Sequence, residues 1–155
     1  MQWLKTLFSS PEPAGPEVLL WRNEPGQSTM TQDDVAVEGE LIRVVAQEPV
    51  TIRLYEVDAL GSDSCLLTFR AKVRTELTEG RAFLEMWCRL AGKGEFFSKG
   101  FDHALVGHTD FATCDCPFLL RAGQKAELLK LNLVVEGRGA VQLKDLEILK
   151  APLKN

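Results

Sequence analysis

The sequence predicts an all-β protein, an antiparallel two-sheet β-sandwich of the jelly-roll type. Short segments rich in aliphatic and β-branched residues recur along the chain, and turn residues separate them at intervals of about 8 to 12 residues. No segment has the apolar periodicity of a helix longer than two turns. The chain has 155 residues, enough for one domain with a single core. We expect that domain at 17–150, after an N-terminal segment and Pro-rich linker at 1–16 and before a C-terminal tail at 151–155.

The first part of the chain contains four short predicted strands. Each is rich in Val, Ile or Leu, which favour a pleated, half-buried surface. A polar loop with a Pro-Gly pair follows the first strand, and Glu48-Pro49 marks a turn before the fourth. The predicted strands are Glu17–Arg22, Val35–Glu40, Leu41–Ala46 and Val50–Val57.

The clearest alternation in the sequence lies in two segments, Cys65–Arg74 and Ala82–Leu90. In each segment every second residue is apolar, as expected for a strand with one face in the core. Only Glu76–Gly80, which contains a glycine and charged residues, separates the second segment from the first. We therefore expect the two strands to pair as an antiparallel hairpin.

A glycine-rich segment with both histidines follows, and three more predicted strands complete the chain. In the last of them the apolar parity shifts, which predicts a β-bulge near Lys144 and Asp145. The three strands are Ala112–Leu120, Leu128–Val135 and Ala140–Leu149. Inward residues from these strands and from the hairpin are expected to share one core: Leu67, Phe69, Leu84, Met86, Cys88, Phe118, Leu131 and Leu133.

The second half of the sequence resembles galactose-binding-like β-sandwich modules of the carbohydrate-binding-module type. The resemblance rests on the strand AFLEMWCRL, the corner Gly107-His108-Thr109-Asp110-Phe111, and Gly137, Gly139, Val141 and Asp145 in the closing strand. It covers about Cys65–Leu149 and implies a jelly roll. Modules of that family commonly bind carbohydrate, and many others mediate protein contacts. Phe111 and Gln142 stand where that family commonly has tryptophan.

Many members of that family hold a structural calcium near the ends of the first and last strands. Asp145 is the matching position here. The residues favour a different role for Asp145, as a hydrogen-bond acceptor at the bulge, because no matching acidic pair occurs near Glu17. We therefore expect no metal and no cofactor.

The outward side chains of the expected hairpin form the candidate binding face. Residues two apart on a strand project to the same side, and a hairpin places the two sets next to each other. The indole of Trp87 can stack on a sugar ring, while carboxylate, guanidinium and amide groups bind hydroxyls. The alternative is a solvated face on which Trp87 covers the stems of charged neighbours. The predicted ligand-binding residues are Arg70, Glu85, Trp87, Arg89, Asp102 and Asn132.

The function expected from this face is that of a non-catalytic module that recognises carbohydrate or another small polar ligand. The alternative is a protein–protein interaction or assembly domain of a cytoplasmic bacterial-type protein, with the amphipathic segment Trp3–Phe8 docking on a partner. No enzyme is expected, because the chain has no nucleophile elbow, P-loop or dinucleotide fingerprint. The predicted strand of Glu85 also offers no second acid for a glycosidase.

Composition and charge exclude other classes of partner. The 18 Lys and Arg against 22 Asp and Glu give a net charge of −4, whereas phosphate binding needs a surplus of cations. No apolar run approaches the roughly 20 residues that a membrane-spanning helix needs. We see no export signal in the sequence, so we expect a cytoplasmic protein with reduced thiols.

The four cysteines all have the parity of neighbouring aliphatic residues, which predicts buried free thiols. Two alternatives use them differently. His103, His108, Cys114 and Cys116 form an H-x4-H-x5-C-x-C series, although its spacing differs from the usual structural zinc sites. Cys65 and Cys88 would face each other across the expected hairpin and could form a disulfide.

Overall fold

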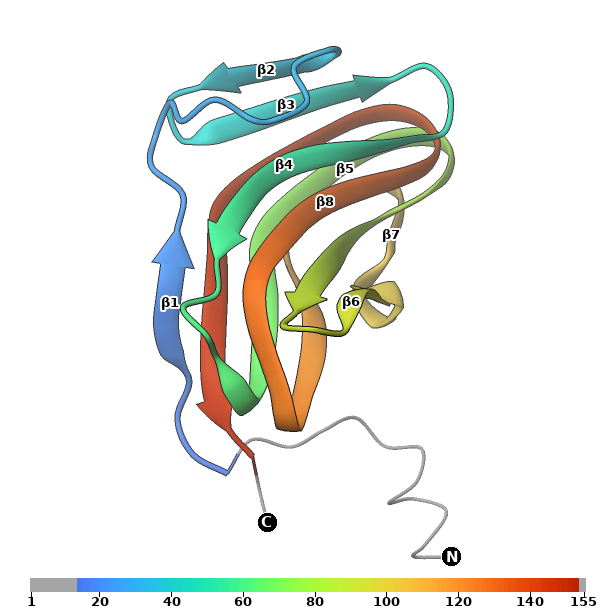
Figure 1. The fold of residues 1–155 in the computed structure, drawn as a ribbon. Helices are drawn as coiled ribbons and strands as arrows, with labels where there is room; N and C mark the ends of the chain where they lie inside the picture. Colours follow the sequence, from blue (N-terminus) through green and yellow to red (C-terminus); the bar gives the residue numbers. More distant parts are fainter. Residues whose placement is uncertain (1–13, 154–155) are drawn as a thin grey trace, which may run out of the picture.

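The computed structural model describes residues 14–153 and contains almost only strands (Figure 1). Within these residues the one helical element is a single 3-10 turn, and no helix is long and apolar enough to cross a membrane. The segment Trp3–Phe8 lies outside the described residues. The elements are β1 (Val18–Arg22), β2 (Val35–Glu38), β3 (Leu41–Ala46), β4 (Val50–Asp58), β5 (Asp63–Leu90), β6 (Gly94–Lys99), η1 (Phe101–His103), β7 (Leu105–His108) and β8 (Ala112–Pro152).

Two long ribbons, β5 and β8, organise the sheet. Leu67 of β5 pairs with Lys150 of β8, and Arg89 pairs with Leu128. Because the residue numbers on β8 decrease as those of their partners on β5 increase, the two strands run antiparallel. Both ribbons bend from one layer into the other, β5 once and β8 twice, so the sheet folds over itself into two layers (Figure 1). This confirms the predicted antiparallel β-sandwich, the fold that the resemblance to galactose-binding-like modules implied.

Both ribbons contribute residues to both layers. The first layer combines residues 63–76 of β5 with 112–120 and 140–152 of β8, and β1 and β3 pair with that last part of β8. The second layer combines residues 79–90 of β5 with 128–136 of β8, and β4 and β6 add on either side. β2 extends the sheet beyond β3, and β7 pairs with β5 near the bend.

The predicted hairpin between Cys65–Arg74 and Ala82–Leu90 is wrong. The two segments are the two halves of β5, and Glu76–Gly80 continues the strand around the bend instead of reversing it. The first half pairs with 112–120 and 140–152 of β8 and the second half with 128–136, and the two halves do not pair with each other. β6 and β7, in the glycine-rich segment, were not predicted.

Glycines form the bend where the two ribbons cross from one layer to the other. Gly80 lies opposite Gly137, and Gly80 adopts a φ of +78°. A Cβ on Gly80 would overlap the carbonyl oxygen of Glu136, and a Cβ on Gly137 would overlap the carbonyl oxygen of Glu79. The backbones approach so closely here that only glycine fits.

The β-bulge predicted near Lys144 and Asp145 is confirmed. Between the pairs Arg70–Glu147 and Lys72–Lys144, β8 contains one residue more than β5. Asp145 adopts a φ of +52°, and its Oδ2 lies 3.5 Å from Nζ of Lys72. The carboxylate thus pairs with the neighbouring strand at the irregularity.

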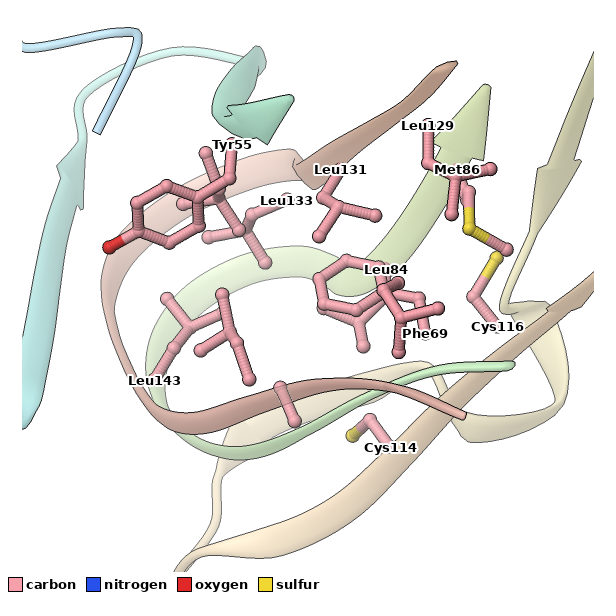
Figure 2. Close-up of a cluster of buried hydrophobic side chains, with 14 of the residues drawn as sticks. Tyr55, Phe69, Leu84, Met86, Cys114, Cys116, Leu129, Leu131, Leu133 and Leu143 are labelled. Carbon is pink, nitrogen blue, oxygen red and sulfur yellow. The ribbon is translucent and has the colours of Figure 1, made fainter. Parts of the chain in front are cut away.

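One apolar core fills the space between the layers (Figure 2). Seven of the eight predicted core residues are buried in it, and Phe118 is partly buried and packs against it. β4 adds Leu54 and Tyr55, which are both buried because the register of β4 shifts at this point. The Tyr55 hydroxyl donates a hydrogen bond to the carbonyl of Gln27 at 2.9 Å.

Gly80→Ala tests the close approach at the bend against a matched control. Gly26 has a φ of +79°, nearly that of Gly80, but a Cβ there meets no atom within 4 Å. Gly26→Ala should therefore cost only the roughly 1–2 kcal/mol of a left-handed residue. Gly80→Ala should lower the free energy of unfolding by more than about 4 kcal/mol, measured by urea denaturation. Equal losses in the two variants would show that the ribbons do not need this contact.

Candidate functional site

A hydrogen-bonded row of polar side chains crosses the outer face of the second layer, which is turned away from the core. Arg53 of β4, Asn132 of β8 and Glu85 of β5 are neighbours across the strands. Arg53 Nε donates to Asn132 Oδ1 at 2.6 Å, and Asn132 Nδ2 donates to Glu85 Oε1 at 2.8 Å. Trp87 Nε1 also donates to Glu85 Oε1, at 3.0 Å. Three of the predicted site residues are thus joined in one network.

This polar row is unusually buried for an outer sheet face. Asn132 is 1% exposed and Glu85 is 7% exposed. Buried polar groups normally have hydrogen-bond partners, and here the partners are the neighbouring side chains themselves. Each bond restricts the rotamer of the next side chain, so the positions of the carboxylate, amide and guanidinium are fixed before any ligand arrives.

Two aromatic rings lie beside the row. Phe97 of β6 lies opposite Trp87 of β5, and their ring centroids are 5.0 Å apart with the planes tilted by 44°. Trp87 is half-buried, and Phe97 is 54% exposed. We call the surface formed by Arg53, Glu85, Trp87, Phe97 and Asn132 the Trp87 face.

Sequence analysis missed two members of the Trp87 face, Arg53 and Phe97. Phe97 follows Phe96, and both are about half exposed, so no alternation identified β6 as a strand. Arg53 lies on a predicted strand with the outward parity. Its neighbour across the sheet was not predictable, because the order of the strands was unknown.

Arg89, another predicted site residue, lies at the margin of the Trp87 face. Its Nη2 lies 3.2 Å from Glu95 Oε1, which also accepts an ion pair from Lys130 Nζ at 2.8 Å. The hydrogen bonds from Lys130 and then Arg89 lower the pKa of the Glu95 carboxyl. Arg89 is therefore engaged with Glu95 rather than with Trp87.

The remaining two predicted residues, Arg70 and Asp102, do not lie beside Trp87, which corrects the single patch expected from the hairpin. Arg70 belongs to the first layer, where it forms a bidentate pair with Asp115: Nε–Oδ1 is 2.7 Å and Nη2–Oδ2 is 3.0 Å. Glu17 Oε1 lies 3.3 Å from the same Nη2. Hydrogen bonding with Asp115 raises the pKa of Arg70 above its already high value.

Arg70 and Asp102 instead line a pocket of about 440 Å³ between the first layer and the η1 segment, which we call the Arg70 pocket. Its size lies within the roughly 300–1,000 Å³ typical of small-molecule sites. The imidazole Nδ1 of His103 accepts a hydrogen bond from the backbone N–H of Asp115 at 2.8 Å. The lining residues are Glu17, Leu66, Thr68, Arg70, Lys99, Gly100, Phe101, Asp102, His103, Asp115, Pro117 and Ala151.

All four cysteines are buried and free. The Sγ of Cys114 donates to the carbonyl of His103 at 3.4 Å, and that of Cys116 to the carbonyl of Ser98 at 3.2 Å. Across residues 14–153 no group of three or more His, Cys, Asp or Glu is arranged to hold a metal ion. Burial raises the pKa of Cys114 to about 11 and that of Cys116 to about 12. These thiols act as small apolar side chains of the core.

No protein-family model matches the chain, and no curated protein sequence matches it significantly. The fold is similar to a solved structure from Clostridium thermocellum, the N-terminal endo-1,4-β-D-xylanase 10B, with CBM22-1 and GH10 modules complexed with xylohexaose. The match covers 90% of this chain and 26% of that chain, at 9% sequence identity and a TM-score of 0.49. At these values the likeness does not indicate a ligand for this chain.

The buried thiols predict a specific loss of stability at high pH. Thiols of the unfolded chain ionise near pH ~8.5, whereas those of Cys114 and Cys116 stay protonated to higher pH. Their contribution to stability is full below pH ~8.5 and is lost as the pH rises toward the folded-state values. The urea midpoint should therefore fall between pH 7.5 and 10, and it should fall less in Cys116→Ala. Equal falls in wild type and variant would contradict this assignment.

Proposed function

We propose that this protein is a non-catalytic binding module that recognises carbohydrate through the Trp87 face. The observation that supports this most is the half-exposed pair of rings, Trp87 and Phe97, beside a fixed row of polar groups. Sugars combine apolar C–H faces with a rim of hydroxyls, so they need aromatic surface and precisely placed donors and acceptors side by side. The Trp87 face offers both.

The polar row still has an acceptor and a donor that are available to a ligand. Glu85 uses Oε1 for both Trp87 and Asn132, and its Oε2 accepts no hydrogen bond from residues 14–153. Arg53 uses Nε for Asn132 and Nη1 for Glu56, at 3.1 Å. Its Nη2 is therefore a further donor. A donor and an acceptor on either side of Asn132 suit two hydroxyls of a bound sugar.

The carboxylates around the Trp87 face support binding rather than catalysis. Glu85 is held by Trp87 and Asn132, Glu56 pairs with Arg53, and Glu95 is paired with two cations. Hydrolysis of a glycosidic bond needs a protonated acid and a second carboxylate across the substrate. Each of these three carboxylates already has a cationic or hydrogen-donating partner among residues 14–153.

We also propose a cytoplasmic location, which the four free buried thiols support. Reduced cysteines are the rule in that compartment.

The competing function is that of a protein-interaction domain. It does not require the Trp87 face to bind any sugar. The two functions therefore separate in a direct binding experiment.

Phe97→Ala and Phe96→Ala form a matched pair for this proposal. The two rings are adjacent in β6 and similarly exposed, at 54% and 47%, but only Phe97 stacks with Trp87. Binding to soluble xylan, β-glucan, mannan and galactan is measured by affinity electrophoresis and calorimetry. For the polysaccharide that binds, Phe97→Ala should weaken affinity ~10-fold, a change of about 1.4 kcal/mol. Phe96→Ala should leave it unchanged.

Variants of Trp87 separate stacking from hydrogen bonding. Trp87→Ala should abolish binding, whereas Trp87→Phe keeps a ring, loses the bond to Glu85 and should bind with intermediate affinity. Circular dichroism and the urea midpoint check that each variant is folded. If none of the polysaccharides binds the wild-type protein, or if Phe96→Ala and Phe97→Ala weaken binding equally, the proposed function is wrong.

A further inference from the structure

The Arg70 pocket and the Trp87 face share a border, formed by Lys99 and Phe101. Lys99 lies opposite Glu85 in the sheet, and its Nζ is 5.4 Å from the ring centroid of Phe97 and 5.7 Å from that of Phe101. Both Lys99 and Phe101 also line the Arg70 pocket. The aromatic surface therefore continues from Trp87 and Phe97, past Lys99, to Phe101 at the pocket.

The pocket contains a hydroxyl that has no hydrogen-bond partner among residues 14–153. Thr68 is only 6% exposed, and its Oγ1 forms no hydrogen bond with any of residues 14–153. Among these residues no fully buried polar side-chain atom lacks a partner, so this hydroxyl is accessible to solvent, and Thr68 lines the pocket. A hydroxyl at a pocket wall can both donate to and accept from the hydroxyls of a bound ligand.

Other groups around Thr68 suit a neutral, hydroxyl-bearing ligand. Phe101 is 46% exposed and provides a ring at the pocket wall. His103 accepts the Asp115 N–H with Nδ1, so a neutral ring carries its proton on Nε2 and can donate it. The guanidinium of Arg70 is already paired with Asp115.

The charge of the lining disfavours an anion. Its carboxylates are Glu17, Asp102 and Asp115, against the two cations Arg70 and Lys99. A phosphate or carboxylate ligand would meet a surplus of negative charge and a guanidinium that is already neutralised. A sugar unit, in contrast, can donate hydroxyl hydrogens to the carboxylates and stack on Phe101.

From these observations we infer that the ligand is a linear oligosaccharide, one sugar unit of which occupies the Arg70 pocket while the preceding units lie on the Trp87 face. This inference rests on the proposed carbohydrate binding and narrows it to a class of ligand. A free monosaccharide would use only one of the two surfaces, whereas a chain of several units gains contacts on both. Affinity should therefore depend on chain length.

The experiment measures affinity against chain length by calorimetry. The probes are β-1,4-linked oligomers of xylose, glucose and mannose with two to six units. Wild-type affinity should rise ~10-fold or more from the dimer to the hexamer of the sugar that binds. Phe101→Ala and Thr68→Val should remove this rise. Phe96→Ala is the control and should retain the rise. Phe101→Ala also removes the contact of Phe101 with Phe83, whereas Thr68→Val leaves that contact in place. Loss of the rise in Thr68→Val would therefore not result from a change in this packing.

The outcomes separate this inference from the proposed function. If binding requires Trp87 but affinity is the same for dimer and hexamer, or if both pocket variants keep the full rise, the Arg70 pocket is not a subsite and the Trp87 face remains the site. If no oligomer of any length binds, the proposed function itself fails, and the inference fails with it. A rise that disappears in both pocket variants supports the chain-binding arrangement.

Discussion

The close approach of two backbones at the bend is the constraint on which this structure depends. Gly80 and Gly137 let β5 and β8 pass within van der Waals contact while both ribbons change layer. Because the strands continue through the bend, the same two ribbons supply both faces of the core. The bend also directs the second half of β5 so that Glu85 and Trp87 point away from the core. Without it, the Trp87 face would not exist as a surface.

The Trp87 face combines burial and polarity in a way that bears on recognition. An amide and a carboxylate that are nearly inaccessible, Asn132 and Glu85, are kept in place by neighbours that are themselves in contact with solvent. Flexible surface groups lose conformational entropy when a ligand fixes them, and groups that are already fixed lose little. The indole bonded to Glu85 is restrained in the same way. Under the proposed function, binding would therefore depend on preorganisation more than on the area that is covered.

Sequence pattern predicted most of the strands but not how two of them connect. The alternation of Cys65–Arg74 and Ala82–Leu90 identified the inward residues correctly, because side-chain parity is a local property. A glycine between two strands is compatible with either a reversal or a bend, and the choice depends on whether another ribbon approaches it. Here Gly137, far along the chain, makes that contact. The error placed Arg70 on the same surface as Trp87, whereas Arg53 was missed because the order of the strands was unknown.

Tryptophan fluorescence tests the central claim, that the Trp87 face binds carbohydrate, most directly. With Trp3 and Trp21 both replaced by phenylalanine, Trp87 is the one indole of the chain. Titration with the polysaccharide that binds should shift or quench this emission in a saturable way, with the same midpoint as calorimetry, because the sugar covers the ring. Binding that saturates in calorimetry while the emission of Trp87 stays constant would contradict the account and place the ligand elsewhere on the molecule.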